Sequence, residues 1–255
     1  MRGLSLFVVV LLSGAAAVAA PAGFRDDMAQ RTLACTGCHG SEGRAGPDGY
    51  YPRIAGKPAG YLYNQLLNFR DGRRHYGLMA GLLDTLSDAY LHDIALHFAS
   101  LDLPYPQPQP STQPPEVLQR GRELALQGDA ERRIPACAAC HGKALTGVVP
   151  GVPGLLGLSR DYLNAQLGAW RTGQRRALAP DCMAEIARRL APEDLSAVTA
   201  WLAAEPLPKN AGPRSADLPP AAPQRRGHRA QPAPAREPPP MRCGAAPPPV
   251  AGSSR

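Results

Sequence analysis

The sequence predicts an all-α protein built from two copies of one small helical domain. An amphipathic stripe at helical spacing is clearest over 61–69, where Tyr61, Leu62, Gln65, Leu66 and Phe69 fall at i, i+1, i+4, i+5 and i+8. Stretches of alternating Val and Ile, which would indicate strands, are nearly absent. A set of residues also recurs, in the same order, about 100 positions further along the chain. The 255 residues have room for two such domains.

The repeat begins with a five-residue motif: Cys35-Thr36-Gly37-Cys38-His39 recurs as Cys137-Ala138-Ala139-Cys140-His141, at an offset of 102. The later matches stay in register, at offsets of 101 to 104: Tyr61, Gln65, Phe69, Arg74 and Met79 correspond to Tyr162, Gln166, Trp170, Arg175 and Met183. A chance coincidence would not keep this register, and two copies are too few for a solenoid. We therefore predict a duplicated domain.

Composition sets the expected boundaries. The first domain covers 24–100 and the second 116–204, and the proline-rich residues 101–115 between them predict a semi-rigid, extended linker. From 206 to 255, 14 of the 50 residues are Pro, so this segment is predicted to be a disordered tail.

Two helix starts can be predicted from local signals. Ser87 is a good N-cap for a helix that runs to about Ala99. In the second copy, Pro192 stands where the first residue of the matching helix is expected.

The N-terminus indicates export. A short positive start, Met1-Arg2-Gly3, precedes the apolar run from Leu4 to Leu12 and the small-residue pattern Ala17-Val18-Ala19. The run is shorter than the roughly 20 residues of a membrane span. We predict that residues 1–19 are a secretory signal peptide that is removed, which in a bacterium means a periplasmic protein. The alternative is that the segment stays as an anchor.

The positive charge is concentrated at one end. The formal net charge is +7, and residues 206–255, with eight Lys or Arg and two Asp or Glu, supply +6 of it. The two domains are close to neutral, which argues against a basic groove for nucleic acid.

The CxxCH motif is typical of covalent haem c attachment. Its two thiols are one helical turn apart, where each can form a thioether with a porphyrin vinyl group, and the adjacent His can bind the iron from the same side. Each domain has fewer than 90 residues and few aromatic side chains, so a haem would supply much of its interior. We predict attachment of two haem c groups at Cys35, Cys38, Cys137 and Cys140, with His39 and His141 as iron ligands.

Three alternatives explain the motif less well. A zinc ribbon expects its CxxC pairs about 15–20 residues apart, and a thioredoxin-like redox site expects a βαβ context. A disulfide within each CxxC would leave the two histidines unexplained.

The sixth iron ligand decides whether the iron can react with small molecules. Met79 and Met183 follow their histidines by 40 and 42 residues and correspond in the repeat, so we predict that both are axial thioethers. His75 is the competing ligand in the first copy. Cys182, beside Met183, has three readings: a buried thiol, which we favour, a partner for Cys243, or an alternative ligand.

Two further pairs of repeated residues are candidates for supporting roles. The carbonyls of Pro52 and Pro153 could hold the second nitrogen of each proximal imidazole, with a plain loop turn as the alternative. The arginine pairs 73–74 and 175–176 could neutralise haem propionates or dock a partner, or simply line a solvated helix end.

The motifs together resemble the dihaem cytochrome c4 family over about 24–204. The resemblance is carried by Cys35-x-x-Cys38-His39-Gly40, Tyr51-Pro52-Arg53-Ile54-Ala55-Gly56, Tyr61-Leu62-x-x-Gln65-Leu66, Met79-Ala80-Gly81-Leu82 and Leu86-Ser87-Asp88. It implies two tandem cytochrome-c-like domains that face each other, with two low-spin His/Met haems. It also implies electron transfer toward a terminal oxidase, often in association with the membrane. The tail, and the sequence Pro180-Asp181-Cys182-Met183 in the second copy, depart from the family pattern.

We therefore expect an electron carrier that binds an oxidase or reductase transiently. The alternative is the electron-accepting cytochrome subunit of a dehydrogenase complex, which a tight stoichiometric partner would reveal. A third class, an enzyme such as a peroxidase, requires an open iron.

Overall fold

The computed structural model describes residues 26–209, 212, 214–215, 241–247 and 249. The predicted signal peptide, residues 1–19, and much of the predicted disordered tail lie outside these ranges. Within them, no helix has the length and apolar character needed to cross a bilayer.

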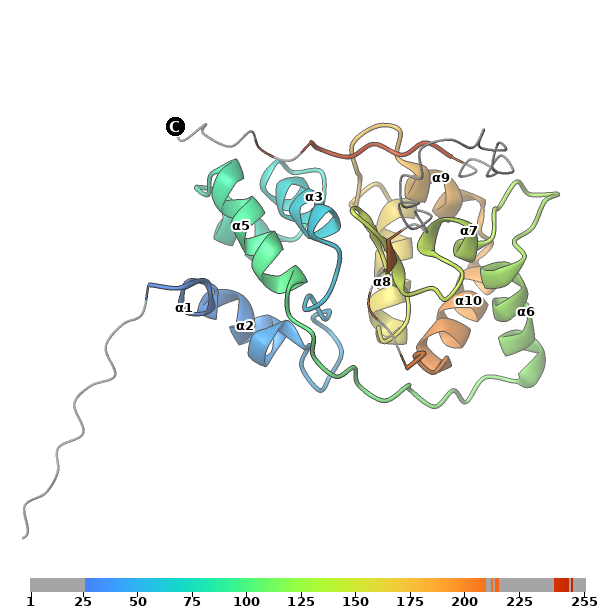
Figure 1. The fold of residues 1–255 in the computed structure, drawn as a ribbon. Helices are drawn as coiled ribbons and strands as arrows, with labels where there is room; N and C mark the ends of the chain where they lie inside the picture. The colour runs from blue at the N-terminus through green and yellow to red at the C-terminus, as the bar shows by residue number, and fades with distance from the viewer. Residues whose placement is uncertain (1–25, 210–211, 213, 216–240, 248, 250–255) are drawn as a thin grey trace, which may run out of the picture.

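The chain forms two helical domains that lie side by side (Figure 1). The helices of the first domain are α1 (Met28–Arg31), α2 (Leu33–His39), the 3-10 turn η1 (Ser41–Gly43), α3 (Ala59–Arg70), α4 (Gly77–Leu83) and α5 (Asp88–Ala99). Those of the second are α6 (Pro115–Leu126), α7 (Cys137–His141), α8 (Arg160–Arg171), α9 (Cys182–Arg189) and α10 (Pro192–Ala204). The all-α prediction is confirmed. Helices α3 and α8 start 101 residues apart, and α5 and α10 start 104 residues apart, which are offsets of the sequence repeat.

The local signals place the helix starts as predicted. Ser87 is the N-cap of α5, and its hydroxyl accepts a hydrogen bond from the Tyr90 amide. Pro192 occupies the first turn of α10, where its missing N–H costs nothing. In the second domain, Ser159 and Asp181 cap α8 and α9 in the same way.

Each domain has its own apolar core. In the first domain Leu62, Leu67, Leu91 and Phe98 from α3 and α5 are buried together. In the second, the core comes mainly from α6, α8 and α10. Side chains of both cores also line the cavity described below.

A small sheet, which the sequence did not predict, lies beside α7. Strand β1 (Gly147–Val149) pairs antiparallel with β2 (Val152–Pro153) and parallel with β3 (Arg214–Ser215). The β1–β2 turn approaches α3 of the first domain so closely that a Cβ on Gly60 would lie 2.7 Å from the carbonyl oxygen of Pro150. The hairpin therefore helps to join the two domains.

The linker is anchored to both domains. The Arg53 guanidinium donates to the carbonyls of Leu103 and Pro104 and lies 4.1 Å from the centre of the Tyr105 ring. Further along, the amide of Gln109 donates to the Ala203 carbonyl at the end of α10. The extended conformation follows from the prolines, and the Arg53 side chain and the Gln109 amide attach the linker to the two domains.

Residues 241–247, which belong to the predicted tail, contact both domains. Cys243 forms a disulfide with Cys182 at the start of α9, with the Cα atoms 5.5 Å apart. The amide of Gly244 donates to Pro180, and that of Ala246 donates to the side-chain oxygen of Asn64 on α3. Our favoured reading of Cys182 as a buried free thiol is therefore wrong. The sequence could not show that the chain returns to this point 61 residues later.

Candidate haem site

A cavity of about 760 Å3 lies between and within the two domains, and residues of both repeats line it. His39, Met79, His141 and Met183, the predicted iron ligands, all contribute to its wall. So do three of the four motif cysteines, Cys35, Cys137 and Cys140. The fold thus brings residues more than 100 positions apart to one largely apolar space.

Each CxxCH motif forms a short helix that ends at its histidine. His39 is the last residue of α2 and His141 the last of α7. The next residues, Gly40 and Gly142, have φ values of 74° and 85°, which lie in the left-handed region that favours glycine. The chain can therefore turn away directly after each histidine and leave its ring against the cavity.

Both imidazoles are held through the nitrogen that would not bind iron. The Nδ1 atom of His39 lies 2.8 Å from the Pro52 carbonyl oxygen, and that of His141 lies 2.7 Å from the Pro153 carbonyl oxygen. Both pairs were predicted from the repeat. A proton on Nδ1 fixes the tautomer that leaves Nε2 as a ligand atom.

Burial also favours the neutral imidazole. Because both rings are largely removed from water, the pKa values of His39 and His141 lie below the ordinary value for histidine. Neighbouring cations, Arg74 near His39 and Lys57 near His141, act in the same direction. A neutral imidazole is the form that coordinates metals.

The methionines lie at corresponding places in the two domains. Met79 is on α4 and Met183 is in the first turn of α9, and both are half-buried against the cavity. His75, the competitor to Met79, also reaches the cavity wall, but it is exposed and belongs to the segment that joins the domains, where its amide donates to Gln174. Of the two candidates for the sixth iron ligand in the first domain, Met79 is therefore the more buried.

The four motif cysteines are free thiols, whereas Cys182 and Cys243 are paired. The structure therefore contains no disulfide within either CxxC. Burial raises the pKa of Cys137 to about 11 and also raises the pKa of Cys35 and Cys140.

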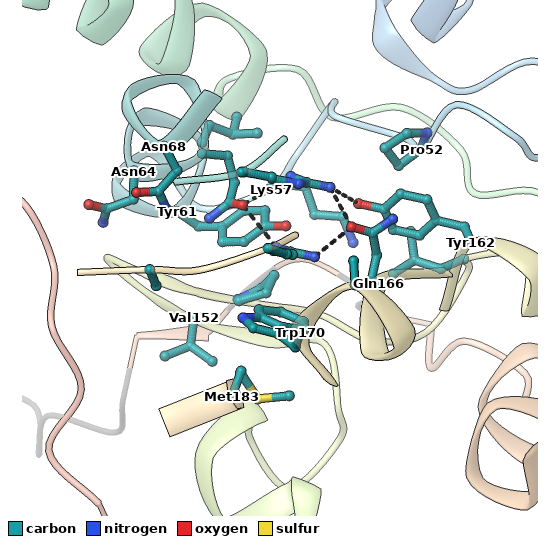
Figure 2. A pocket seen from close by; sticks show the side chains of 18 of the residues that line it. Pro52, Lys57, Tyr61, Asn64, Asn68, Val152, Tyr162, Gln166, Trp170 and Met183 are labelled. Atoms are coloured by element: carbon teal, nitrogen blue, oxygen red, sulfur yellow. Dashed lines mark hydrogen bonds between the residues drawn. The ribbon is translucent and has the colours of Figure 1, made fainter. Parts of the chain in front are cut away.

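Two arginines that correspond in the repeat meet at the centre of the domain interface. Arg74 and Arg175 form an antiparallel bridge through their backbones, and their side chains are only 9% and 4% exposed. Each guanidinium hydrogen-bonds to glutamines of both domains, Gln65 and Gln166 (Figure 2). The reading of these two residues as a solvated helix end is wrong, because the interface covers them.

The hydrogen-bond partners of the two arginines are uncharged. They are the Gln65 and Gln166 side-chain oxygens and, for Arg74, the Tyr162 hydroxyl. Buried charges are costly unless they are paired. Two buried cations that line the cavity fit a group that carries carboxylates, and haem has two propionates.

The sequence reasoning missed one buried cation. Lys57 lines the cavity, is 4% exposed, and donates from Nζ to the Gly154 carbonyl oxygen of the other domain at 3.1 Å. The matching residue in the second repeat is Leu158. The difference between Lys57 and Leu158, inside an otherwise repeated segment, is the sequence feature that could have identified this lysine.

These features define a class: a c-type cytochrome with two helical domains, each presenting a CxxCH helix and a methionine to a shared apolar interior. Comparisons with known proteins show which family within this class the chain resembles. The chain is 39% identical over 174 residues to a thiosulfate dehydrogenase electron acceptor of Thiomonas intermedia, which covers 68% of this chain and 79% of that protein. It is 32% identical to cytochrome c4 of Pseudomonas aeruginosa over 68% of this chain and 84% of that protein.

The structural comparison agrees. The crystal structure of reduced cytochrome c4 from Pseudomonas stutzeri matches with a TM-score of 0.61 and 29% identity, over 72% of this chain and 99% of that one. No family model matches the chain. The chain belongs to the cytochrome c4 family, whose members bind two covalent haem c groups. The haem cofactors and electron-transport role expected from the sequence are thereby confirmed.

Proposed function

We propose that this protein carries single electrons in the periplasm through two low-spin haems, each bound by one histidine and one methionine. In this proposal the thioether bonds form at Cys35, Cys38, Cys137 and Cys140, and the axial pairs are His39 with Met79 and His141 with Met183. The observation that carries it is the repeated geometry: each domain holds one imidazole through a proline carbonyl and presents a methionine to the same cavity.

Two strong axial ligands close the iron to small molecules and leave electron transfer as its chemistry. A thioether favours Fe(II) and raises the reduction potential, which suits a carrier near the oxidising end of a respiratory chain. We therefore assign the protein a carrier role rather than an enzymatic one, with a terminal oxidase as the acceptor and transient, peripheral contact with the membrane.

The donor is best sought among dehydrogenases that act on sulfur oxyanions. The relative at 39% identity, and a second from Stutzerimonas stutzeri at 37%, are both named thiosulfate dehydrogenase electron acceptors, whereas relatives named cytochrome c4 are 28–32% identical. This favours the second candidate function, an electron-accepting partner of a dehydrogenase.

One set of measurements tests the carrier function. Protein matured in a host that attaches haem should contain two haems, show two one-electron steps in a potentiometric titration, and fail to bind carbon monoxide when reduced. Prompt binding at either haem, or a single haem per chain, would contradict the proposal.

A second experiment separates the two candidate roles. The oxidised protein is mixed with thiosulfate in the presence and absence of a purified thiosulfate dehydrogenase, and reduction is followed by absorbance. Fast reduction that requires the dehydrogenase, together with a stoichiometric complex on gel filtration, would support the acceptor role. Slow reduction without a complex would instead support the role of a freely diffusing carrier.

A further inference from the structure

Lys57 extends from the first domain into the interior of the interface. It follows Gly56 and precedes the start of α3, and its ammonium donates to the Gly154 carbonyl oxygen of the second domain at 3.1 Å. Only 4% of the residue is exposed, and it lies among the side chains that line the cavity (Figure 2).

Within the described ranges, the charge of Lys57 has no acidic partner. No carboxylate there forms an ion pair with its Nζ, and burial and the neighbouring Arg53 cation both lower the pKa of Lys57, to about 8. A charge away from water is screened weakly, so it acts over a longer range than a surface lysine would.

The position of the ammonium is not symmetric between the domains. Gly154 directly follows Pro153, whose carbonyl oxygen lies 2.7 Å from Nδ1 of His141. Lys57 is thus one peptide unit from the group that holds the proximal imidazole of the second domain, and its field acts on His141. The corresponding residue of the second repeat is Leu158, which brings no charge to the first domain.

A haem gains one positive charge on oxidation, and a nearby fixed cation makes that form less stable. We propose that Lys57 raises the reduction potential of the haem of the second domain relative to that of the first. Lys57 thereby biases the shared electron toward the second domain. This inference rests on the proposed function, because it requires one redox-active haem in each domain.

The test compares four single substitutions in the full haem-loaded protein. Lys57→Met and Lys57→Gln remove the charge, and the glutamine keeps a donor for the Gly154 carbonyl. Lys57→Arg keeps the charge. Lys143→Met is the matched control, since Lys143 is an exposed lysine two residues after His141.

The two midpoint potentials are measured by spectroelectrochemical titration and assigned to domains by the NMR signals of the axial methionine methyls. We expect Lys57→Met and Lys57→Gln to lower the midpoint of the second domain and to shift the electron-sharing equilibrium between haems at least threefold, or roughly 28 mV for a one-electron couple. Lys57→Arg and Lys143→Met should change the electron-sharing equilibrium by less than threefold.

Three results would overturn the inference. An unchanged equilibrium in Lys57→Gln, with a shift only in Lys57→Met, would assign the effect to the hydrogen bond. An equal shift of both midpoints would show that Lys57 acts on the two haems alike. No shift in Lys57→Met or Lys57→Gln would show that Lys57 does not affect either potential. If the unsubstituted protein lacks two one-electron steps, the proposed function itself fails, which the wild-type titration shows before any variant is made.

Discussion

The proximal histidines illustrate how individual residues are prepared for iron binding. Each Nδ1 is held by a proline carbonyl, and burial keeps each ring neutral. Neither feature depends on the histidine alone. The carbonyl comes from a loop 12 or 13 residues further along, which is why the repeated prolines were useful predictors of the site.

The methionine assignment gives the first prediction. Met79→Ala and Met183→Ala should each open one iron, so that carbon monoxide binds half of the haem in the reduced protein. The potential of the opened haem should fall, because the thioether that favours Fe(II) is lost. Absorbance spectra with and without carbon monoxide, and a redox titration, measure both effects.

Met28→Ala provides the control for these variants. Met28 packs against the core of the first domain and has no counterpart in the second repeat, so its loss should leave both potentials and the closed irons unchanged. A Met79→Ala protein whose spectrum and potential match the wild type would point to His75 as the ligand.

An acidic pair in the second domain gives a pH prediction. Asp194, whose side chain is 6% exposed, accepts from Arg120 at 2.8 Å and pairs with Arg132. Burial acts to raise the pKa of Asp194, but the hydrogen bonds from the two arginines outweigh it and lower the pKa. Hydrogen bonds from Arg132 and Arg120 also lower the pKa of Asp129 to about 2.

A carboxyl with a lowered pKa in the folded state stabilises the fold above its unfolded pKa, near 4, and that stability is lost as the pH falls through the folded value. The unfolding free energy of the wild type should therefore drop between about pH 4 and pH 2. Asp194→Asn should lose about 1–3 kcal/mol at neutral pH and depend less on pH in this window. Glu131→Gln, an exposed neighbour, is the control and should follow the wild-type curve. Equal pH slopes for wild type and Asp194→Asn would contradict the assignment.

Among the secondary-structure elements, the crossing of α6 and α10 is the closest contact of the second domain. Gly121 on α6 faces α10, where an added Cβ would overlap the Ala197 carbonyl and lie 2.9 Å from the Cβ of Trp201. The two helices can approach only because this position has no side chain. Glycine inside a helix is otherwise unfavourable by about 1 kcal/mol relative to alanine.

Gly121→Ala should therefore destabilise the second domain by about 1–3 kcal/mol, since the helices must separate to admit the methyl group. Gly168→Ala on α8 is the matched control, because a Cβ there meets nothing within 4 Å. That substitution should be neutral or stabilise the protein by up to about 1 kcal/mol. Denaturant unfolding measures both, and a stable Gly121→Ala protein would show that the crossing can relax.

At the scale of the whole molecule, the two domains are joined by groups from both repeats. The Arg74 and Arg175 side chains share the glutamines Gln65 and Gln166, and residues 241–247 extend from α9 to α3. The joint is therefore polar at its centre. At one side, the Cys182–Cys243 disulfide ties to the second domain the segment whose Ala246 amide reaches Asn64 of the first domain.

The disulfide should contribute to stability by closing a long loop in the unfolded chain. Reduction, or the double substitution Cys182→Ser and Cys243→Ser, should lower the unfolding free energy by about 2–4 kcal/mol. Thermal unfolding with and without dithiothreitol measures the effect. The double variant serves as the control, because the reductant should no longer change its melting temperature. A wild-type melting temperature that is independent of dithiothreitol would show that the loop closure contributes nothing.

Much of the site could be predicted because its chemistry is local or repeated. The CxxCH motifs, the caps Ser87 and Pro192, and the proline carbonyls all act through neighbours within about 13 residues, so a short stretch of sequence contains both partners. The repeat then identified Met79 and Met183 as counterparts, which a single copy could not have done.

What the sequence determined by itself was therefore the helical class, the duplication and the two haem motifs, because covalent spacing and helical periodicity are written in the order of residues. Only the tertiary structure decided how the halves meet: that Arg74 and Arg175 are buried together, that Lys57 reaches the loop behind His141, and that Cys243 returns to Cys182. These contacts join residues about 60 to 100 positions apart. No local pattern encodes such contacts, because they arise when two apolar surfaces and the chain between them pack against each other.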